Sequence, residues 1–313
     1  METLRVLRPG PLTTVQDQGR VGWQAFGVPL SGASDKFSSQ CANLLVGNPA
    51  TAAVLEMTFL GDKLEVLAPC LLALCGAEMP LAINGQAAPG WTALAARPGD
   101  KLAVGQAVKG LRGYLAVSGG IDAPLVMGSR STYLGGGFGG HQGRALKKGD
   151  VLAAEPGAAS REGKTLPLEL RPHLAGPFTL RAAPGPQDEL FGEGLATFFS
   201  TPYTVSDKVN RQGCRLAGAR VERLAQAPLS IISESNVPGG VQIPENGQPI
   251  IVLTEQTTSG YTKAASVITP DLDLVAQARP GQTLRFQKLT LKQAHAAHRE
   301  RLELMALVAR TLA

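Results

Sequence analysis

The 313-residue chain is poor in charged and aromatic residues. Charged residues make up 18% of it, against about 25% in an average globular protein, and the formal net charge of +5 is spread without a run of like charges. Aromatic residues are 5% of the chain. A disordered chain needs more charge, and a nucleic-acid-binding surface needs basic patches with stacking aromatics, so both classes are disfavoured. No apolar stretch approaches the length that would cross a membrane.

The sequence also lacks the short motifs of several enzyme classes. It has no G-x-x-x-x-G-K-[ST] phosphate loop, no H-E-x-x-H zinc pattern, no G-x-S-x-G nucleophile elbow and no M-K-M site for covalent biotin. The four cysteines form no C-x-x-C pair, which favours reduced thiols, and the N-terminus has no signal-peptide pattern. We therefore expect a cytoplasmic protein. His295 and His298 have no third ligand at a recognisable spacing, so no metal site is predicted.

Glycine and proline, by contrast, are abundant, with 37 and 22 residues, and they predict many turns. Residues 54–117 read as short, closely spaced strands without intervening helices, which indicates a mainly β fold of the barrel or sandwich type. Residues 155–177 lack periodicity and are rich in proline and glycine, so we interpret them as a linker between domains at 1–154 and 178–313. Lys292–Leu312 predicts an amphipathic closing helix.

Uncharged polar residues are concentrated between Val241 and Ala265. Asn246-Gly247 lies between two apolar segments and predicts a β-hairpin. The second strand of this hairpin is a continuous apolar run, which predicts burial on both faces, and it leads to the polar segment Gln256–Tyr261. Amide and hydroxyl groups beside a glycine suit a neutral amide or carboxamide ligand better than a phosphate. The alternative is that these side chains only satisfy the backbone of turns.

A turn near the N-terminus contains the next candidate residues. Asp17 and Gly19 predict a turn that brings Gln16, Asp17 and Arg20 close together, so an Asp17–Arg20 ion pair forms easily there. Such a pair either belongs to a site or only holds the N-terminus in place.

A loop at residues 27–35 leads into a helix that ends at residues 47–49. Ser34 is the predicted N-cap, and Phe37 and Cys41 lie on the apolar face of the helix. The N-terminus of this helix would suit an anion or a developing oxyanion, although capping alone also explains the pattern.

The second half begins with a predicted strand at Phe178–Arg181 and a short helix at Gln187–Thr197. Asn210 and Arg211, next to a glycine, make either a carboxylate clamp or a solvated turn. The fragments RPGDKLAV at Arg97 and RPGQTLRF at Arg279 suggest that the two halves share an architecture.

The sequence resembles a family known as allophanate hydrolase subunit 2, biotin-dependent carboxyltransferase subdomains A and B, or the C-type subunit of 5-oxoprolinase. The resemblance covers nearly the whole chain. It rests on TTVQDQGR, GVPLSGASD, ANLLVGN, RGYLAVSGGID, GSRST, NRQGCRLAG, VQIPENGQPI and QTTSGY, in that order. It implies two cyclophilin-like β-barrel subdomains and a B-type partner protein of the allophanate hydrolase subunit 1 family. It further implies ATP-dependent opening of 5-oxo-L-proline to L-glutamate, with Mg and ATP in the assembled complex and an A-type protein as third component.

Two other functions fit the same resemblance. One is a carboxyltransferase component of a biotin-dependent urea or amide carboxylase, with biotin on another chain. The other is a non-enzymatic regulator that acts on a sensor-kinase inhibitor. The chain also departs from the family pattern, with Thr254 in place of an acid, Ser259 in place of a glycine and Thr262 in place of a proline. The acid could have bound a metal or acted as a general base, and Glu255 is one residue out of register with it.

The residues and the resemblance together give a set of candidate site residues. The candidate catalytic residues are Gln256, Thr257, Thr258 and Tyr261, and the Gln256 amide and the backbone N–H groups around Thr258 to Gly260 would donate to a developing oxyanion. The candidate substrate-binding residues are Asn210, Arg211, Gln242, Asn246, Gln248, Asp17, Arg20 and Ser31.

Overall fold

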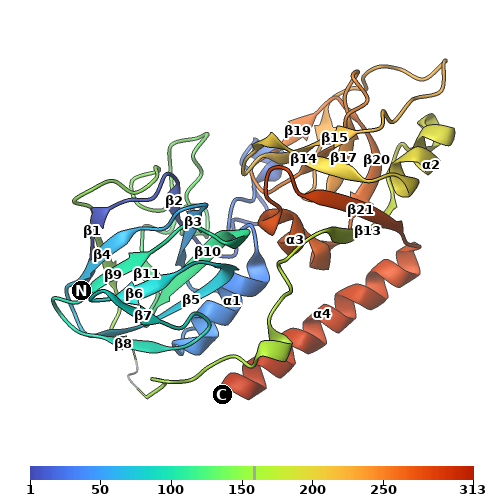
Figure 1. The fold of residues 1–313 in the computed structure, drawn as a ribbon. Coiled ribbons are helices and arrows are strands. Elements are labelled where there is room, and N and C mark those ends of the chain that lie inside the picture. The colour runs from blue at the N-terminus through green and yellow to red at the C-terminus, as the bar shows by residue number, and fades with distance from the viewer. Residues whose placement is uncertain (158–159) are drawn as a thin grey trace. The chain divides into compact units, whose positions relative to one another are not determined.

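The computed structural model describes residues 1–157 and 160–313, and Ala158 and Ala159 of the predicted linker lie outside the described residues. The chain divides into two compact units, and Figure 1 labels many of their helices and strands. Unit 1 comprises Met1–Val21, Ser31–Leu174 and Leu304–Ala313, and unit 2 comprises Gly22–Leu30 and Ala175–Glu303. Each unit has a hydrophobic core of its own.

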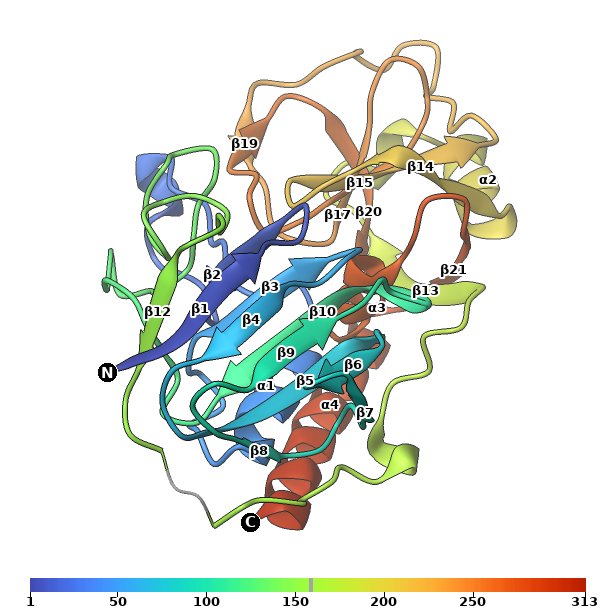
Figure 2. The same cartoon turned by 60° about the vertical axis from the view of Figure 1, so that its left-hand side comes forward.

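Unit 1 is built from two β-sheets. Its strands are β1 (Glu2–Arg8), β2 (Thr13–Gln16), β3 (Val54–Thr58), β4 (Lys63–Val66), β5 (Cys70–Glu78), β6 (Leu81–Ile83), β7 (Gln86–Ala88), β8 (Leu94–Ala96), β9 (Lys101–Val104), β10 (Lys109–Val117), β11 (Ile121–Asp122) and β12 (Val151–Ala154). One sheet has the order β11-β12-β1-β4-β9-β6-β7 and the other the order β2-β3-β10-β5-β8. Figure 2 shows β12, β1, β4 and β9 side by side.

The burial of these strands follows their sequence patterns. In β4 and β9 only every second residue is buried, as alternating strands with one covered face should be. In β5 and β10 nearly every residue is buried; this fits the apolar run of β5, whereas β10 also buries Arg112. The hairpin of β6 and β7 turns at Asn84 and Gly85, which both have positive φ angles, as a two-residue turn of this kind requires.

Helix α1 (Lys36–Leu45) packs on β5 and β10, and its N-cap is Asp35 rather than the predicted Ser34. The Asp35 carboxylate accepts hydrogen bonds from the backbone N–H and the hydroxyl of Ser38, at 2.9 and 2.6 Å. Ser34 instead donates its backbone N–H to the Glu56 carboxylate at 2.8 Å. Serine and aspartate are about equally good caps, so this tertiary contact decides between neighbouring residues.

Unit 2 is organised around a closed barrel. Its strands are β13 (Phe178–Pro184), β14 (Tyr203–Val209), β15 (Gly213–Gly218), β16 (Glu234–Ser235), β17 (Gly240–Ile243), β18 (Ile250–Val252), β19 (Thr258–Ser259), β20 (Thr262–Val267) and β21 (Thr283–Lys288). The barrel has the order β13-β20-β17-β18-β15-β14-β21, and β16 and β19 form a separate two-stranded sheet. Strands β13 and β21 pair in parallel, and the other barrel pairs are antiparallel.

The remaining elements are helices. They are η1 (Gln24–Phe26), η2 (Leu168–Leu170), η3 (Asp188–Leu190), α2 (Glu193–Ser200), η4 (Thr269–Asp271), α3 (Leu272–Gln277) and α4 (Leu291–Leu312). The predicted C-terminal helix is confirmed as α4. The helix predicted at Gln187–Thr197 is wrong in its bounds, because Gly192 has a positive φ angle and separates η3 from α2.

The two RPG fragments form the same local turn. The backbone N–H of Asp100 donates to the Arg97 carbonyl, and that of Gln282 donates to the Arg279 carbonyl, both at 3.0 Å. In each turn the side chain of the fourth residue accepts a hydrogen bond from the backbone N–H of the first residue. Asp100 accepts from Arg97, and Gln282 accepts from Arg279. The following strands then pair differently, since β9 is antiparallel to both neighbours and β21 is parallel to β13. The two fragments therefore have the same turn, but the strands that follow them pair differently in the two units.

The structure confirms a mainly β fold with few helices and a long C-terminal helix. Of the two predicted barrels, unit 2 contains a closed one, whereas unit 1 has two sheets. In the described part of the chain, no helix has the length and apolar character needed to span a membrane.

Candidate functional site

The predicted hairpin delivers the polar segment to a small ribbon in unit 2. Strands β17 and β18 pair antiparallel around the Asn246-Gly247 turn, with Val241 opposite Ile251, and β18 is fully buried. After β18 the chain forms β19, which pairs with β16 and places Thr258 opposite Ser235. The predicted catalytic residues therefore lie on and beside this ribbon. Gln256 and Thr257 are half-buried, and Thr258 and Tyr261 are exposed.

A buried polar pair lies on two neighbouring barrel strands. Gln242 of β17 is opposite Lys263 of β20, and both side chains are buried. Val241 and Ile243, on either side of Gln242, belong to the barrel core. Because side chains alternate along a strand, Gln242 points to the other face, away from that core. The Gln242 amide and the Lys263 ammonium are thus buried on the face of the sheet that points away from the barrel core.

Asn236 connects this pair to the ribbon. Its Oδ1 accepts a hydrogen bond from Gln242 Nε2 at 2.8 Å, and its backbone N–H donates to the Thr257 carbonyl at 2.8 Å. Gln24 Nε2 donates to the Asn236 carbonyl and also to the Thr257 carbonyl, the latter at 3.2 Å. Asn236 is fully buried, and no described residue accepts a hydrogen bond from its Nδ2. The cluster therefore contains an amide donor without an acceptor in the described chain.

Lys263 forms an ion pair with Glu234. Gln187 supports this pair, because its Nε2 donates to Glu234 Oε1 at 2.9 Å and its Oε1 accepts the Lys263 backbone N–H at 2.9 Å. The Lys263 ammonium, followed by the Gln187 amide, lowers the pKa of Glu234 below its ordinary value. The Glu234 side chain is 42% exposed, whereas that of Lys263 is 5% exposed. The carboxylate thus reaches solvent while the ammonium does not.

Taken together, these residues form the unit 2 polar cluster, which consists of Gln24, Gln187, Glu234, Asn236, Gln242 and Lys263. Its chemistry is an ammonium and several amide groups placed beside the backbone of the β16–β19 ribbon. Such groups bind oxygen atoms of carboxylates, amides and ureas, since all of them are hydrogen-bond donors. Among the described residues, no group of three or more His, Cys, Asp or Glu side chains is placed to hold a metal ion.

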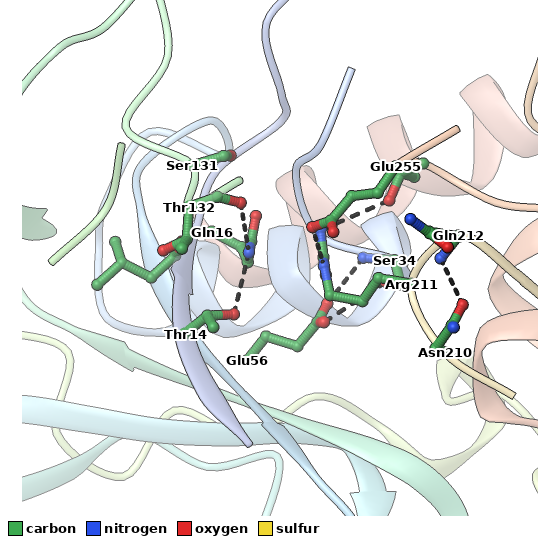
Figure 3. Close-up of polar contacts among 12 residues, drawn as sticks. Thr14, Gln16, Ser34, Glu56, Ser131, Thr132, Asn210, Arg211, Gln212 and Glu255 are labelled. Atoms are coloured by element: carbon green, nitrogen blue, oxygen red, sulfur yellow. Dashed lines mark hydrogen bonds and ion pairs between the residues drawn. The ribbon is translucent and has the colours of Figure 1, made fainter. Parts of the chain in front are cut away.

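Arg211 lies at the other end of the polar segment and is already paired. Its Nε donates to Glu255 Oε1 at 2.5 Å, and its Nη2 lies 3.5 Å from Thr254 Oγ1. Figure 3 shows the contact between Arg211 and Glu255. Both side chains are at most 5% exposed, so the alternative of a solvated turn arginine is wrong. The predicted role of Arg211 as a carboxylate clamp would require it to leave or share Glu255.

Three other predicted binding residues serve turns. Asn210 Oδ1 accepts the backbone N–H groups of Gln212 and Gly213, at 2.8 and 3.1 Å. Asn246 Oδ1 accepts the N–H of Gln248, and Gln248 bonds both backbone groups of Gly218. These contacts match the alternative in which polar side chains satisfy turn backbone. The structure does not gather these three residues into the unit 2 polar cluster.

Asp17, in unit 1, is the centre of a hydrogen-bonded loop junction. Its carboxylate accepts the Gly19 N–H at 2.8 Å, the Ser129 and Ser131 hydroxyls at 2.7 and 2.5 Å, and the Arg130 N–H at 2.6 Å. The turn predicted on Asp17 and Gly19 is thus confirmed. Since a carboxylate with several donors is well satisfied, Asp17 serves to join residues 17–19 to residues 129–131.

The neighbouring candidates in unit 1 are also buried. Arg20 Nη2 donates to the Ser131 carbonyl at 2.6 Å, and its guanidinium lies 5.0 Å from the centre of the Phe138 ring. Gln16 Nε2 donates to Thr14 and to the Thr132 carbonyl, as Figure 3 shows. Ser31 has a φ angle of 53° and is fully buried, and its hydroxyl has no partner among the described residues.

A second buried cluster of unit 1 was not predicted from the sequence. Glu56 Oε2 accepts the Ser34 N–H at 2.8 Å and the Tyr114 hydroxyl at 2.9 Å, and Glu56 Oε1 lies 3.8 Å from Arg112 Nε. The Tyr114 hydroxyl also accepts the Asp35 N–H. Burial, and then the charges of Glu56 and Asp35, raise the pKa of Tyr114 well above its ordinary value. We call these residues the unit 1 charged cluster.

Sequence reasoning missed most of the unit 2 polar cluster. Gln24, Gln187, Glu234 and Asn236 lie on loops or very short elements without periodic patterns. Lys263 could have been noticed in the sequence, because it is the one charged residue in the strand TKAASV. A lysine in a buried barrel strand, here between Thr262 and Ala264, must either reach solvent or find a buried partner.

Residues 26–288 match the carboxyltransferase domain, subdomain A and B, and the chain belongs to this family. Within it, the chain is similar to the C-type subunit of 5-oxoprolinase from Escherichia coli (strain K12), with 38% identity over 95% of this chain and 94% of that protein. The corresponding 5-oxoprolinase protein of Haemophilus influenzae is 32% identical over 90% of this chain and 89% of its own length. These findings confirm the resemblance that the sequence motifs indicated.

The fold is also that of a solved relative. The urea amidolyase of K. lactis superposes with a TM-score of 0.92 at 30% identity, over 98% of this chain. The chain spans 20% of the length of that urea amidolyase. The fold match therefore covers one part of a much longer protein.

Proposed function

We propose that this protein is the C-type subunit of an ATP-dependent 5-oxoprolinase, which opens 5-oxo-L-proline to L-glutamate together with B-type and A-type partner proteins. The observation that carries the proposal is the near end-to-end match to the C-type 5-oxoprolinase protein of E. coli, over 95% of one chain and 94% of the other. The match to urea amidolyase covers only a fifth of that protein, so it supports the fold more than the reaction.

The chemistry proposed for unit 2 concerns the lactam carbonyl. ATP, with Mg, is a substrate of the assembled complex: its γ-phosphoryl group is transferred to this oxygen, the β,γ-phosphoanhydride bond breaks and ADP is released. Water then adds to the activated carbon, the ring C–N bond breaks with the nitrogen taking a proton, and phosphate is released with L-glutamate. This chain supplies hydrogen-bond donors where negative charge develops on the oxygen. The proposed donors are the Gln256 amide, the Thr257, Thr258 and Tyr261 hydroxyls, and backbone N–H groups of the polar segment. Their half-buried or exposed positions leave them accessible to a substrate or a partner.

The finer assignments belong to the same proposal. We propose that both units are cyclophilin-like, that the B-type partner is of the allophanate hydrolase subunit 1 family, and that this chain has no covalent biotin. We also propose that Arg211 holds the start of the polar segment through Glu255, because the two side chains are buried together. A cytoplasmic location stays a prediction.

Reconstitution tests the function directly. The purified chain is mixed with its A-type and B-type partners, ATP, Mg²⁺ and 5-oxo-L-proline, and glutamate release and ATP hydrolysis are followed. We expect glutamate only when all three chains and ATP are present. A complex that assembles but releases no glutamate would remove the proposal.

The second candidate is the carboxyltransferase component of a biotin-dependent carboxylase. The fold match to urea amidolyase and the family itself favour it. It predicts transfer of labelled carboxyl groups from a separate carboxybiotin-bearing chain to urea or an amide. The same preparations, supplied with such a chain, distinguish labelled carboxylated product from glutamate.

A further inference from the structure

Lys263 is a buried cation whose partner lies at the surface. Lys263 as a whole residue is 4% exposed, whereas the side chain of Glu234 is 42% exposed. An ammonium in a buried place needs an anion beside it, because an unpaired buried charge is strongly destabilising. For a carboxylate that water already reaches, the free-energy cost of leaving the ion pair is much smaller, because water replaces the contacts it gives up. Glu234 is therefore an anion that another carboxylate can replace.

Asn236 supplies a second donor at the same place. Asn236 directly follows β16, and its backbone N–H donates to the Thr257 carbonyl at 2.8 Å, next to the Ser235–Thr258 pair, so the pairing of β16 with β19 continues by one residue. In such a paired segment residues two apart face the same side, which is the basis for placing Asn236 beside Glu234. The Asn236 Oδ1 is held by Gln242, which is the cross-strand neighbour of Lys263. Its fully buried Nδ2 lacks an acceptor among the described residues. A buried amide donor of this kind is satisfied when a ligand brings an oxygen acceptor.

The other buried basic residue beside the polar segment is held differently. Arg211 is paired with Glu255 at 2.5 Å, and both partners are buried. Separating Glu255 from Arg211 would break an ion pair in which both side chains are buried, and this is costly. An incoming carboxylate therefore replaces Glu234 at Lys263 at a lower cost than Glu255 at Arg211.

We propose that Lys263 binds the carboxylate of a small substrate, which displaces Glu234, and that Asn236 Nδ2 donates a hydrogen bond to an oxygen of the same substrate. The ligand class is a small carboxylate that also carries an amide or lactam group. Its identity as 5-oxo-L-proline rests on the proposed function. Lys263 then replaces Arg211 as the residue that recognises the carboxylate.

Calorimetric binding to the assembled complex without ATP tests this assignment. The ligands are 5-oxo-L-proline and 2-pyrrolidinone, which has the same lactam ring without the carboxylate. The variants are Lys263→Met, Glu234→Gln and the control Lys208→Met, whose lysine is exposed in unit 2. The complex with the wild-type chain is measured beside them, and glutamate release is measured on the same preparations.

The two variants are expected to change the affinity for 5-oxo-L-proline in opposite directions. Lys263→Met weakens binding of 5-oxo-L-proline by roughly ten- to hundredfold, the usual size for a lost hydrogen bond to a charged group, and leaves 2-pyrrolidinone binding unchanged. Glu234→Gln removes the internal competitor and tightens binding of 5-oxo-L-proline severalfold. Lys208→Met changes neither affinity.

Several results would overturn the assignment. They are a wild-type complex that does not bind 5-oxo-L-proline, a Lys263→Met complex with unchanged affinity, and equal weakening of both ligands. Glu234→Gln that weakens binding, or leaves it unchanged, contradicts the displacement as well. If Lys263→Met does not assemble, the sign of the Glu234→Gln effect decides alone. Glutamate release reports separately on the proposed function, so either proposal can fail while the other stands.

Discussion

The charged cluster of unit 1 and the polar cluster of unit 2 both bury ionic groups beside a β-sheet, and they differ in how their carboxylates meet solvent. Glu56 is 1% exposed, and its neighbours Arg112 and Tyr114 are equally buried. Glu234 is 42% exposed, although its partner Lys263 is buried. The enclosed Glu56 carboxylate, through its contacts with Ser34, Tyr114 and Arg112, joins strand β3 to strand β10 and to the segment before α1. A carboxylate that reaches solvent can leave its partner, and this difference separates a structural cluster from a candidate binding site.

The largest expected effect comes from opening the enclosed cluster. Glu56→Gln removes the charge of the carboxylate in the buried Arg112–Glu56 ion pair, so we expect the free energy of unfolding to fall by about 3–5 kcal/mol. Urea denaturation of the purified chain measures it. The matched control is Glu65→Gln in the neighbouring sheet, where the Arg5–Glu65 pair is partly exposed and should contribute about 1 kcal/mol or less. Equal effects from the two variants would contradict the contrast between enclosed and exposed carboxylates.

Tyr114→Phe removes a single hydroxyl from the same cluster. This hydroxyl donates to Glu56 and accepts the Asp35 N–H, so both groups lose a partner in a buried place. We expect a loss of about 2–3 kcal/mol, since buried groups left unsatisfied are costly. The thermal midpoint of the variant should fall accordingly while its circular dichroism stays that of the wild type. An unchanged midpoint would show that the hydroxyl contributes nothing to the cluster.

Replacement of Asp150 in unit 1 is expected to have an intermediate effect on stability, and this effect should depend on pH. Hydrogen bonds from Arg144 lower the pKa of Asp150 to about 2, from an ordinary value of 3.8. Because the folded-state pKa is depressed, the stabilisation is complete above about pH 4 and is lost as the pH falls towards 2. It amounts to about 2 kcal/mol. Asp150→Asn should reduce stability by that amount at pH 7 and flatten the dependence between pH 4 and 2. A variant whose acid unfolding profile runs parallel to that of the wild type would contradict this assignment.

The smallest effect on stability is expected at the exposed carboxylate. Glu234→Gln leaves the buried Lys263 ammonium with an amide oxygen in place of its carboxylate, and this has a cost. Because water reaches residue 234 and lowers that cost, we expect a loss of about 1–2 kcal/mol. Differential scanning calorimetry of this variant beside Glu56→Gln sharpens the comparison. A loss as large as that of Glu56→Gln would place Glu234 among the structural residues and count against its displacement by substrate.

The sequence predicted the regular parts of the fold because their signals are local. The Asn246-Gly247 turn, the short strands of residues 54–117 and the C-terminal helix follow from turn residues and periodicity. The choice of Asp35 over Ser34 as N-cap depends on Glu56, which is distant in the sequence, and no local pattern reveals it. The division of unit 1 into two sheets likewise depends on long-range pairing.

The candidate site was predicted less completely, for a related reason. The polar segment Gln256–Tyr261 and Gln242 were found, because their stretch is rich in amides and hydroxyls. Lys263, Glu234 and Asn236 come together only through the β16–β19 ribbon and the cross-strand pairing of β17 with β20. The pairing of Arg211 with Glu255 was also hidden, because the two residues are 44 apart in the sequence and no local pattern links them.

The most direct test of the proposed site is the initial rate of ATP-dependent glutamate release, measured against 5-oxo-L-proline concentration, for complexes that carry Lys263→Met or Tyr114→Phe in this chain. We predict that the Tyr114→Phe complex, once assembled, has the KM and kcat of the wild type, because the unit 1 charged cluster is structural. The Lys263→Met complex should show a KM raised by roughly ten- to hundredfold. Glutamate release by Lys263→Met at an unchanged KM would contradict the proposed site in unit 2, and no release by the wild-type complex would contradict the proposed function.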